Sequence, residues 1–254
     1  MKISSALTLL CLLPIAVGTV GANDEAATAA QGGLAGKTIV IMGDSSTTAN
    51  MWPEAMQRLY LPASCRVVNT AVGGTHWEHI AGQWFRAKAA LGDQRPDIVI
   101  ITTGGNKFPD PASSYDDIIA LCENASLQPV SPETYAVLNL RKITKEAPAV
   151  DLYLVSNFYA GSFPAKNRTR RAYRTQLTAL CDYFSCNLID LTSQSNIRGY
   201  LEKDPTQRLF TNDGVHAATD AGKERIARVI YGTLLRNYPP LKEPAPSQAD
   251  TPAR

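Results

Sequence analysis

The sequence places chemically capable groups in four short stretches that are far apart along the chain. Three of them follow apolar runs directly, and the fourth lies near the C-terminus. The stretches are Gly43-Asp44-Ser45, Gly73-Gly74, Gly104-Gly105-Asn106-Lys107 and Asp213-x-x-His216. Each alone is weak evidence for a site, because short combinations of common residues occur by chance. Together they contain the groups needed to hydrolyse an ester through a serine nucleophile.

A serine, a histidine and an aspartate in this set predict nucleophilic catalysis. A serine hydroxyl becomes a nucleophile when a base takes its proton, and His216 is the candidate base for Ser45. Asp213 is close enough in sequence to hold the imidazole in the required tautomer through one tight turn. A competing interpretation is that Asp44, Ser45 and Ser46 only cap the helix that follows. We favour Ser45 as the nucleophile and its neighbours as caps, because the other stretches supply its partners.

The remaining stretches supply hydrogen-bond donors for a tetrahedral intermediate. We expect the N–H of Ser45, the N–H of Gly74 and the side-chain amide of Asn106 to point at its oxyanion. Glycine suits the second of these positions because it lets the backbone approach a substrate closely.

The elements that must position these groups follow a strand–helix alternation. Short β-favouring runs occupy residues 38–42, 66–72, 97–103, 151–156 and 187–191, and each is nearly continuously apolar, as strands buried on both faces are. Helical patterns occupy residues 52–60, 77–91, 132–146, 168–184 and 219–236. This alternation predicts a parallel sheet covered by helices on both sides. Ligand sites in such folds lie beyond the carboxyl ends of the strands, which is where these stretches fall.

The four stretches, with Asn69 ahead of the second, resemble the sequence blocks of the SGNH/GDSL hydrolase family in order, and the likeness covers residues 38–236. The resemblance implies a flavodoxin-like α/β fold, a three-layer α/β/α sandwich with a five-stranded parallel sheet, and esterase or lipase chemistry on acyl esters. It implies that Ser45 is the nucleophile, that Gly74 and Asn106 complete the oxyanion hole, and that Asp213 and His216 complete the triad.

Besides Ser46, which stands at a variable position where the family name has leucine, two features depart from the family pattern. Lys107 stands where the family usually has an aspartate, and the segment HAATDAG lacks the common proline after His216. Neither departure removes a catalytic atom. Because of Lys107, the family's local loop geometry and substrate preference do not carry over directly to this chain.

The two ends of the chain differ from its centre. Residues 1–22 have a lysine, an apolar run and then small residues, which is the order of a secretory signal, with an uncleaved membrane anchor as the alternative. We expect a flexible lead-in over residues 23–35, one hydrolase domain over 36–238 and a proline-rich disordered tail over 239–254. The mature protein is therefore expected to be secreted or periplasmic, without stable membrane association after cleavage.

Four cysteines follow the expected signal: Cys65, Cys122, Cys181 and Cys186. In an exported chain this number favours two disulfides, and the short loop CDYFSC makes Cys181–Cys186 the natural local pair, leaving Cys65–Cys122. All three connectivities remain open, and buried free thiols are the alternative.

Other candidate residues lie near the expected site. His76 and His79 have a spacing that can share a metal, but no third ligand is evident, so we interpret them as polar residues at a helix start. His76, Trp77 and Phe108 are candidate substrate contacts, and the aromatic pair could equally anchor loops on the core. The basic segment 165–174 is interpreted as the solvated face of a helix rather than as a site for an anionic polymer.

The sequence as a whole predicts a secreted serine esterase that needs no cofactor or metal. Family analogy and export favour acyl esters, O-acetyl groups on carbohydrate above all, as the small-molecule or polysaccharide substrate. A lysophospholipase or short-chain lipase is the first alternative, and a non-catalytic glycan-binding protein, which Lys107 would favour, is the second. A net charge of +2 over 254 residues gives no reason to expect nucleic acid as a partner, and we expect a monomer.

Overall fold

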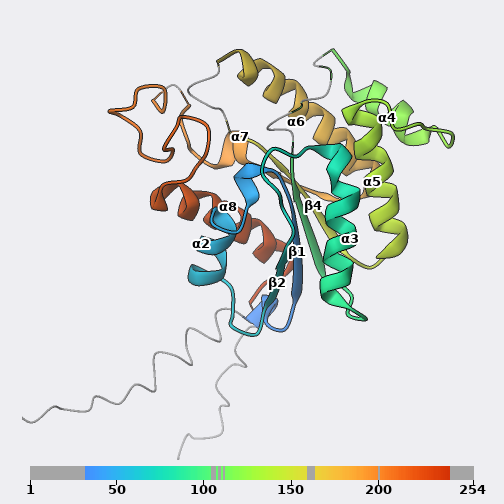
Figure 1. Ribbon diagram of the computed structural model, residues 1–254, viewed down its shortest axis with the longest axis horizontal. Coiled ribbons are helices and arrows are strands. Elements are labelled where there is room, and N and C mark those ends of the chain that lie inside the picture. The colour runs from blue at the N-terminus through green and yellow to red at the C-terminus, as the bar shows by residue number, and fades with distance from the viewer. Residues whose placement is uncertain are drawn as a thin grey trace, which may run out of the picture.

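The computed structural model describes residues 32–103, 107, 110, 112–158, 164–199 and 201–240. In this part of the chain five strands form one sheet, all neighbours being parallel, in the order β2-β1-β3-β4-β5 (Figure 1). The strands are β1 (Thr38–Gly43), β2 (Arg66–Asn69), β3 (Ile98–Thr102), β4 (Asp151–Ser156) and β5 (Asn187–Asp190). This is the flavodoxin-like strand order, so the predicted fold class is confirmed.

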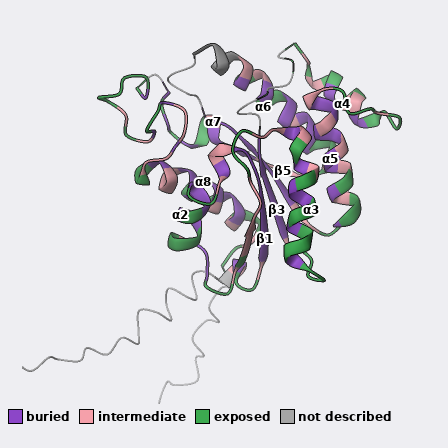
Figure 2. Ribbon diagram, viewed as in Figure 1, coloured by how far each residue is buried: buried purple, intermediate pink, exposed green. Residues whose placement is uncertain are grey.

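The strands differ in burial according to their place in the sheet. β1 and β3 are buried at every position, because helices cover both faces of the central sheet (Figure 2). β2 and β5 are edge strands with partly exposed residues, so the expectation of full burial is wrong for these two. The strand expected over 66–72 ends at Asn69, whose Oδ1 accepts the Ala71 N–H and turns the chain away.

Helices cover the sheet on both faces (Figure 1). One face carries α3 (Ile80–Leu91), α4 (Tyr115–Glu123), α5 (Pro132–Glu146) and α6 (Pro164–Phe184); the other carries α2 (Trp52–Leu59), α7 (Leu191–Gln194) and α8 (Asp220–Asn237). The short 3-10 helices are η1 (Gly32–Leu34), η2 (Ser45–Thr47) and η3 (Trp77–His79). The sequence pattern missed α4 and α7, both short, and η1 occupies part of the lead-in that was expected to be flexible. Leu34 at the end of η1 is fully buried.

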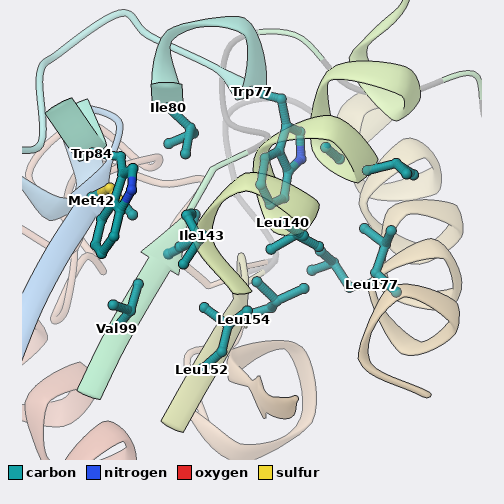
Figure 3. Close-up of a cluster of buried hydrophobic side chains, with 14 of the residues drawn as sticks. Met42, Trp77, Ile80, Trp84, Val99, Leu140, Ile143, Leu152, Leu154 and Leu177 are labelled. Atoms are coloured by element: carbon teal, nitrogen blue, oxygen red, sulfur yellow. The ribbon is translucent and has the colours of Figure 1, made fainter. Parts of the chain in front are cut away.

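Alternate residues of the central strands supply two separate cores. Val40 and Met42 of β1 face α3 and α5, whereas Ile39 and Ile41 face α2 and α8, because successive side chains of a strand point to opposite faces. Figure 3 shows the first core, where Met42 and Val99 meet the side chains of the helices above them. The sheet is thus held from both sides, and its carboxyl ends carry the loops that form the site.

The four described cysteines are free thiols. Cys122 is a residue of α4 and lies in the core on one face of the sheet, and Cys65 packs against the core on the other face. The expected Cys65–Cys122 pair is therefore wrong, because the sheet separates the two residues. Cys181 and Cys186 are neighbours that share a hydrogen bond in the thiol state. Within the described ranges, no helix combines the length and apolar character needed to cross a membrane.

Candidate active site

Ser45 lies directly beyond the carboxyl end of β1, at the first position of η2. The Asp44 side chain caps this helix, because its Oδ1 accepts hydrogen bonds from the N–H of Ser46 at 2.9 Å and from the Ser46 hydroxyl at 2.6 Å. The prediction that Asp44 caps the helix after β1 is therefore confirmed. Asp44 holds the turn, and the Ser45 hydroxyl is directed elsewhere.

Gly43 fixes the position of this turn. Its φ is +155°, and a Cβ there would lie 2.1 Å from the carbonyl oxygen of Thr102, so no other residue fits between β1 and β3. The buried side chain of Gln83 holds the same glycine from α3: its Oε1 accepts the Gly43 N–H at 2.7 Å and its Nε2 donates to the Gly43 carbonyl at 2.9 Å. The sequence does not indicate this role of Gln83, because no local pattern in its helix shows that the side chain reaches β1.

The structure brings Ser45, His216 and Asp213 into one hydrogen-bonded chain. Ser45 Oγ lies 2.9 Å from Nε2 of His216, and Nδ1 of the same ring lies 2.6 Å from Oδ2 of Asp213. The serine and the histidine are 171 residues apart in sequence. Such an arrangement allows the imidazole to take the serine proton while the carboxylate holds the ring in place.

The Asp213 carboxylate is held by the turn that it shares with His216. Its Oδ1 accepts hydrogen bonds from the backbone N–H groups of Val215 at 2.8 Å and His216 at 2.7 Å. Partial burial raises the pKa of Asp213, but hydrogen bonds from the backbone and ring of His216 outweigh this effect, so the pKa lies below its ordinary value. The carboxylate is therefore charged at neutral pH, as its orienting position requires.

Glu202 organises the loop that carries this turn. It is only 2% exposed, and its Oε2 accepts from the backbone N–H of Thr211 at 2.9 Å and from its hydroxyl at 2.6 Å. Oε1 accepts from the N–H groups of Leu209 and Phe210, both at 3.2 Å. The Thr211 hydroxyl in turn accepts the N–H of Gly214. Burial raises the pKa of Glu202, but the hydrogen bonds from these donors lower it by more, so the pKa lies below its ordinary value. Glu202 is a positioning residue that sequence reasoning missed.

A buried arginine faces the residue before the candidate nucleophile. Arg170 of α6 is 5% exposed, and its guanidinium donates to the carbonyl oxygen of Phe158 at 2.8 Å. Burial lowers the pKa of Arg170 to about 10, while the charge of the buried Asp44 acts in the opposite direction. The expectation of a solvated helix face over 165–174 is therefore wrong at Arg170.

The candidate oxyanion donors are only partly described. Gly74 lies in the loop after β2 with φ at +77°, a conformation that favours glycine, and a Cβ built on its neighbour Gly73 would lie 3.8 Å from Cβ of Ser45. The Asn69 side chain ties this loop to the first one by donating to the Thr47 carbonyl at 2.9 Å. Asn106 and Phe108 lie outside the described residues.

Trp77 is not a substrate contact. Its side chain is 1% exposed, lies in the core shown in Figure 3 and donates from Nε1 to the hydroxyl of Tyr173 at 2.8 Å. The earlier expectation is wrong because η3 turns this side chain inward beneath the loop. His76 keeps a small exposed surface of 14% of its side chain and contacts Glu78, and burial lowers its pKa.

A small cavity is lined in part by Ser46 and Ala217, the residues that follow Ser45 and His216 in sequence. Ser46, Ala217 and Ile226 are among its lining residues, with Trp52, Asn157, Phe158 and Leu191. The cavity volume is about 10 Å³, which is room for about one water molecule. Trp52 Nε1 and Asn157 Nδ2 in its wall are buried donors that have no hydrogen-bond partner among the described residues.

Comparison with known proteins agrees with this fold. The model of the GDSL-like Lipase/Acylhydrolase family matches residues 19–225, and no curated protein matches the sequence. A lipase/acylhydrolase from Enterococcus faecalis is 16% identical with a TM-score of 0.53, over 82% of this chain and 100% of that one. LAE5, an alpha/beta hydrolase enzyme from the metagenome of Lake Arreo, is 21% identical with a TM-score of 0.55, over 78% and 94%. A mutant of Axe2, an acetyl-xylooligosaccharide esterase from Geobacillus stearothermophilus, is 20% identical with a TM-score of 0.51, over 85% and 99%. At these identities the likeness concerns the fold.

Proposed function

Because the chain belongs to the GDSL-like Lipase/Acylhydrolase family, whose activity is ester hydrolysis, we propose that it is an exported serine esterase that removes O-acetyl groups from carbohydrate. The observation that carries the proposal is the hydrogen-bonded chain from Ser45 Oγ through the His216 ring to Asp213. Among the described residues, no other group of side chains joins a serine hydroxyl, a histidine base and an orienting carboxylate through hydrogen bonds.

The proposed reaction has two steps. In the first, Ser45 Oγ bonds to the acyl carbon while His216 Nε2 takes the hydroxyl proton and delivers it to the leaving alcohol. In the second, His216 takes a proton from water, the oxygen of that water bonds to the acyl carbon, and the acid leaves as the proton returns to Ser45. Asp213 keeps the ring in the tautomer with Nδ1–H and stabilises the imidazolium that forms.

The tetrahedral intermediates need donors at their oxyanion. We assign this role to the backbone N–H groups of Ser45 and Gly74 and to the side-chain amide of Asn106. Removing one such donor costs roughly 10²- to 10³-fold in kcat in a serine hydrolase.

We assign the acyl group to the small cavity lined by Ser46 and Ala217, next to Ser45 and His216 in sequence, and the size of this cavity favours acetyl. An acetyl ester places a single methyl group next to the reacting carbonyl, and a cavity of about 10 Å³ accepts a group of about that size. Longer acyl chains would have to displace Leu191 or Ile226, which are buried core residues. The proposal that carbohydrate carries the acetyl group is supported by the expected export and by the fold that the chain shares with Axe2, an acetyl-xylooligosaccharide esterase.

Export and oligomeric state belong to the same proposal. Cleavage after residue 22 would give a mature secreted or periplasmic chain that begins at Asn23, works as a monomer and binds neither nucleic acid nor, stably, a membrane. N-terminal sequencing of the protein recovered outside the cytoplasm tests the cleavage, and light scattering tests the monomer. A product that retains residues 1–22 would contradict the first of these statements.

The catalytic proposal is tested with Ser45→Ala on a series of p-nitrophenyl esters from acetyl to decanoyl. We expect loss of at least about 10³-fold in kcat, because the nucleophile is removed. Ser126→Ala, an exposed serine between α4 and α5, is the matched control and should keep the wild-type rate.

Three outcomes of this series contradict parts of the proposal. Equal rates for Ser45→Ala and wild type would refute the nucleophile. Rates that rise towards decanoyl would indicate a lipase instead, and absence of activity on every ester would indicate a binding protein. Acetate release from acetylated xylan tests the carbohydrate substrate directly.

A further inference from the structure

The turn that follows the Gly73-Gly74 loop gathers two imidazoles and a carboxylate. His76 precedes η3, and Glu78 and His79 lie within it. One ligand atom from each of the three side chains lies within 4.8 Å of the others. The sequence pattern showed the two histidines without a third ligand; the structure turns Glu78, which lies between them in sequence, onto the same side.

The distances within this cluster suit a tetrahedral ion. Glu78 Oε1 lies 3.0 Å from His76 Nε2 and 3.6 Å from His79 Nε2. Ligands about 2.0–2.1 Å from a tetrahedral ion are separated from one another by about 3.4 Å. The two rings stand at 84° to each other with centroids 4.6 Å apart, so they do not stack, and their nitrogens can converge.

We propose that His76, Glu78 and His79 form a binding site for a divalent transition-metal ion of the Zn²⁺ class, with the fourth coordination position open to solvent. Two imidazole nitrogens and one carboxylate oxygen favour Zn²⁺ and its transition-metal neighbours over Mg²⁺ and Ca²⁺, which prefer ligand sets made of oxygen.

The turn is anchored firmly enough to present these ligands. Trp77, in the middle of the cluster, is buried; it donates to the hydroxyl of Tyr173, and its carbonyl accepts from the Asn139 side chain at 2.7 Å. On the N-terminal side, the Thr75 hydroxyl donates to the Gly43 carbonyl at 3.0 Å. Because the backbone is held on both sides of His76, binding a metal orders little more than three side chains.

A surface hollow gives an ion access to this cluster. Glu78 and His79 line it together with residues of α3 such as Gln83 and Arg86, and its volume is about 380 Å³. The side chain of His79 is 44% exposed, which leaves room for water on the ion.

Two existing contacts compete with the metal. The Lys107 ammonium lies 3.7 Å from Glu78 Oε2, so it neutralises part of the charge that an ion would use. The N–H of His76 donates to His79 Nδ1 at 3.3 Å, and this long bond is lost when Nε2 binds the metal, because Nδ1 then carries the proton. The affinity is therefore lower than three good ligands alone would give, and it should be adjustable at Lys107.

The experiment is calorimetric titration of the untagged chain with ZnCl₂, together with the absorption spectrum of the Co²⁺ form. The whole sequence has three histidines, so single substitutions distinguish the sites. We expect one equivalent to bind, with affinity falling at least about tenfold in His76→Ala, Glu78→Gln and His79→Ala, since each loses a ligand. Lys107→Ala should tighten binding by about two- to fivefold, as removal of an exposed competing ion pair predicts.

The matched control is His216→Ala, which removes the remaining histidine and should leave Zn²⁺ binding unchanged. Binding that is lost in His216→Ala, or unchanged in His79→Ala, would overturn the proposal. A Co²⁺ spectrum with the intense charge-transfer band of a cobalt–thiolate bond would also overturn it, because that band would place the metal on the cysteines. Failure of the wild type to bind Zn²⁺ in chelator-free buffer would do the same. Circular dichroism confirms that each variant is folded, and these readouts are independent of esterase activity.

Discussion

Replacing Glu202 by glutamine should both destabilise the protein and slow it, although this side chain does not touch Ser45, His216 or Asp213. The carboxylate accepts four hydrogen bonds, two at each oxygen, from Leu209, Phe210 and Thr211. Glutamine keeps one acceptor oxygen and places an NH₂ group against the other pair of donors. Two buried donors lose their acceptor, at a cost of about 1–3 kcal/mol each.

The expected loss of stability is therefore about 2–6 kcal/mol, which lowers Tm by roughly 4–24 °C for a chain of this size. We expect the variant to fold, because this loss is smaller than most of the usual range of about 5–15 kcal/mol for the stability of a domain. The pKa of Glu202 is lowered in the folded state, so its contribution is complete above the ordinary carboxyl pKa and is lost as pH falls through the folded value. Glu202→Gln lacks this pH-dependent contribution to stability. Its Tm should therefore fall less steeply than that of wild type as pH is lowered below about 5.

The effect on rate passes through Thr211. Its hydroxyl accepts the N–H of Gly214, which lies between Asp213 and His216. A displacement of about 1 Å at a catalytic group can cost about 10²-fold, so we expect kcat on p-nitrophenyl acetate to fall about 10- to 100-fold with KM nearly unchanged.

Glu224→Gln is the matched control, because the Glu224 side chain is 43% exposed and pairs with Arg228 one helical turn away. It should change stability by no more than about 0.5 kcal/mol. If Glu202→Gln melts at the wild-type temperature and keeps the wild-type kcat, the role of Glu202 in positioning the loop is refuted.

Three further substitutions test other parts of the site. Gly43→Ala should yield little folded protein, because its Cβ would lie 2.1 Å from the Thr102 carbonyl oxygen; recovery of soluble protein with a wild-type Tm would contradict this packing. Asp213→Asn should lower kcat about 10³- to 10⁴-fold while KM changes little, because the amide no longer holds the His216 ring in its working tautomer; a stopped-flow or steady-state rate within a few-fold of wild type would argue against the triad. Leu191→Ala enlarges the cavity lined by Ser46 and Ala217, the proposed acyl site, and should raise the ratio of kcat/KM for butyrate over acetate about tenfold, at a cost of about 2–5 kcal/mol in denaturant unfolding; an unchanged ratio would mean that the acyl group lies elsewhere.

Local patterns in the sequence were sufficient for the features that depend on neighbouring residues. The apolar runs predicted all five strands and the class of sheet, because burial of both faces leaves a direct trace in the composition of the central strands, and the partly exposed edge strands β2 and β5 keep enough apolar residues to be recognised. The Asp44 cap followed from residue type and position in the same way. Asp213 and His216 lie in one turn, so their spacing alone indicated that they could touch.

Tertiary structure decided the contacts between residues that are distant in sequence. Only the packing of α8 and its preceding loop at the carboxyl end of β1 places His216 beside Ser45. Gln83, Arg170 and Glu202 have no local signal, because their partners lie on other elements or across a loop. The burial of Trp77 was missed for the same reason, since it packs among residues of several elements and its Nε1–H donates to Tyr173, which is 96 residues away. A sequence pattern records which residues prefer burial or a cap, whereas the identity of each partner depends on how the helices pack on the sheet.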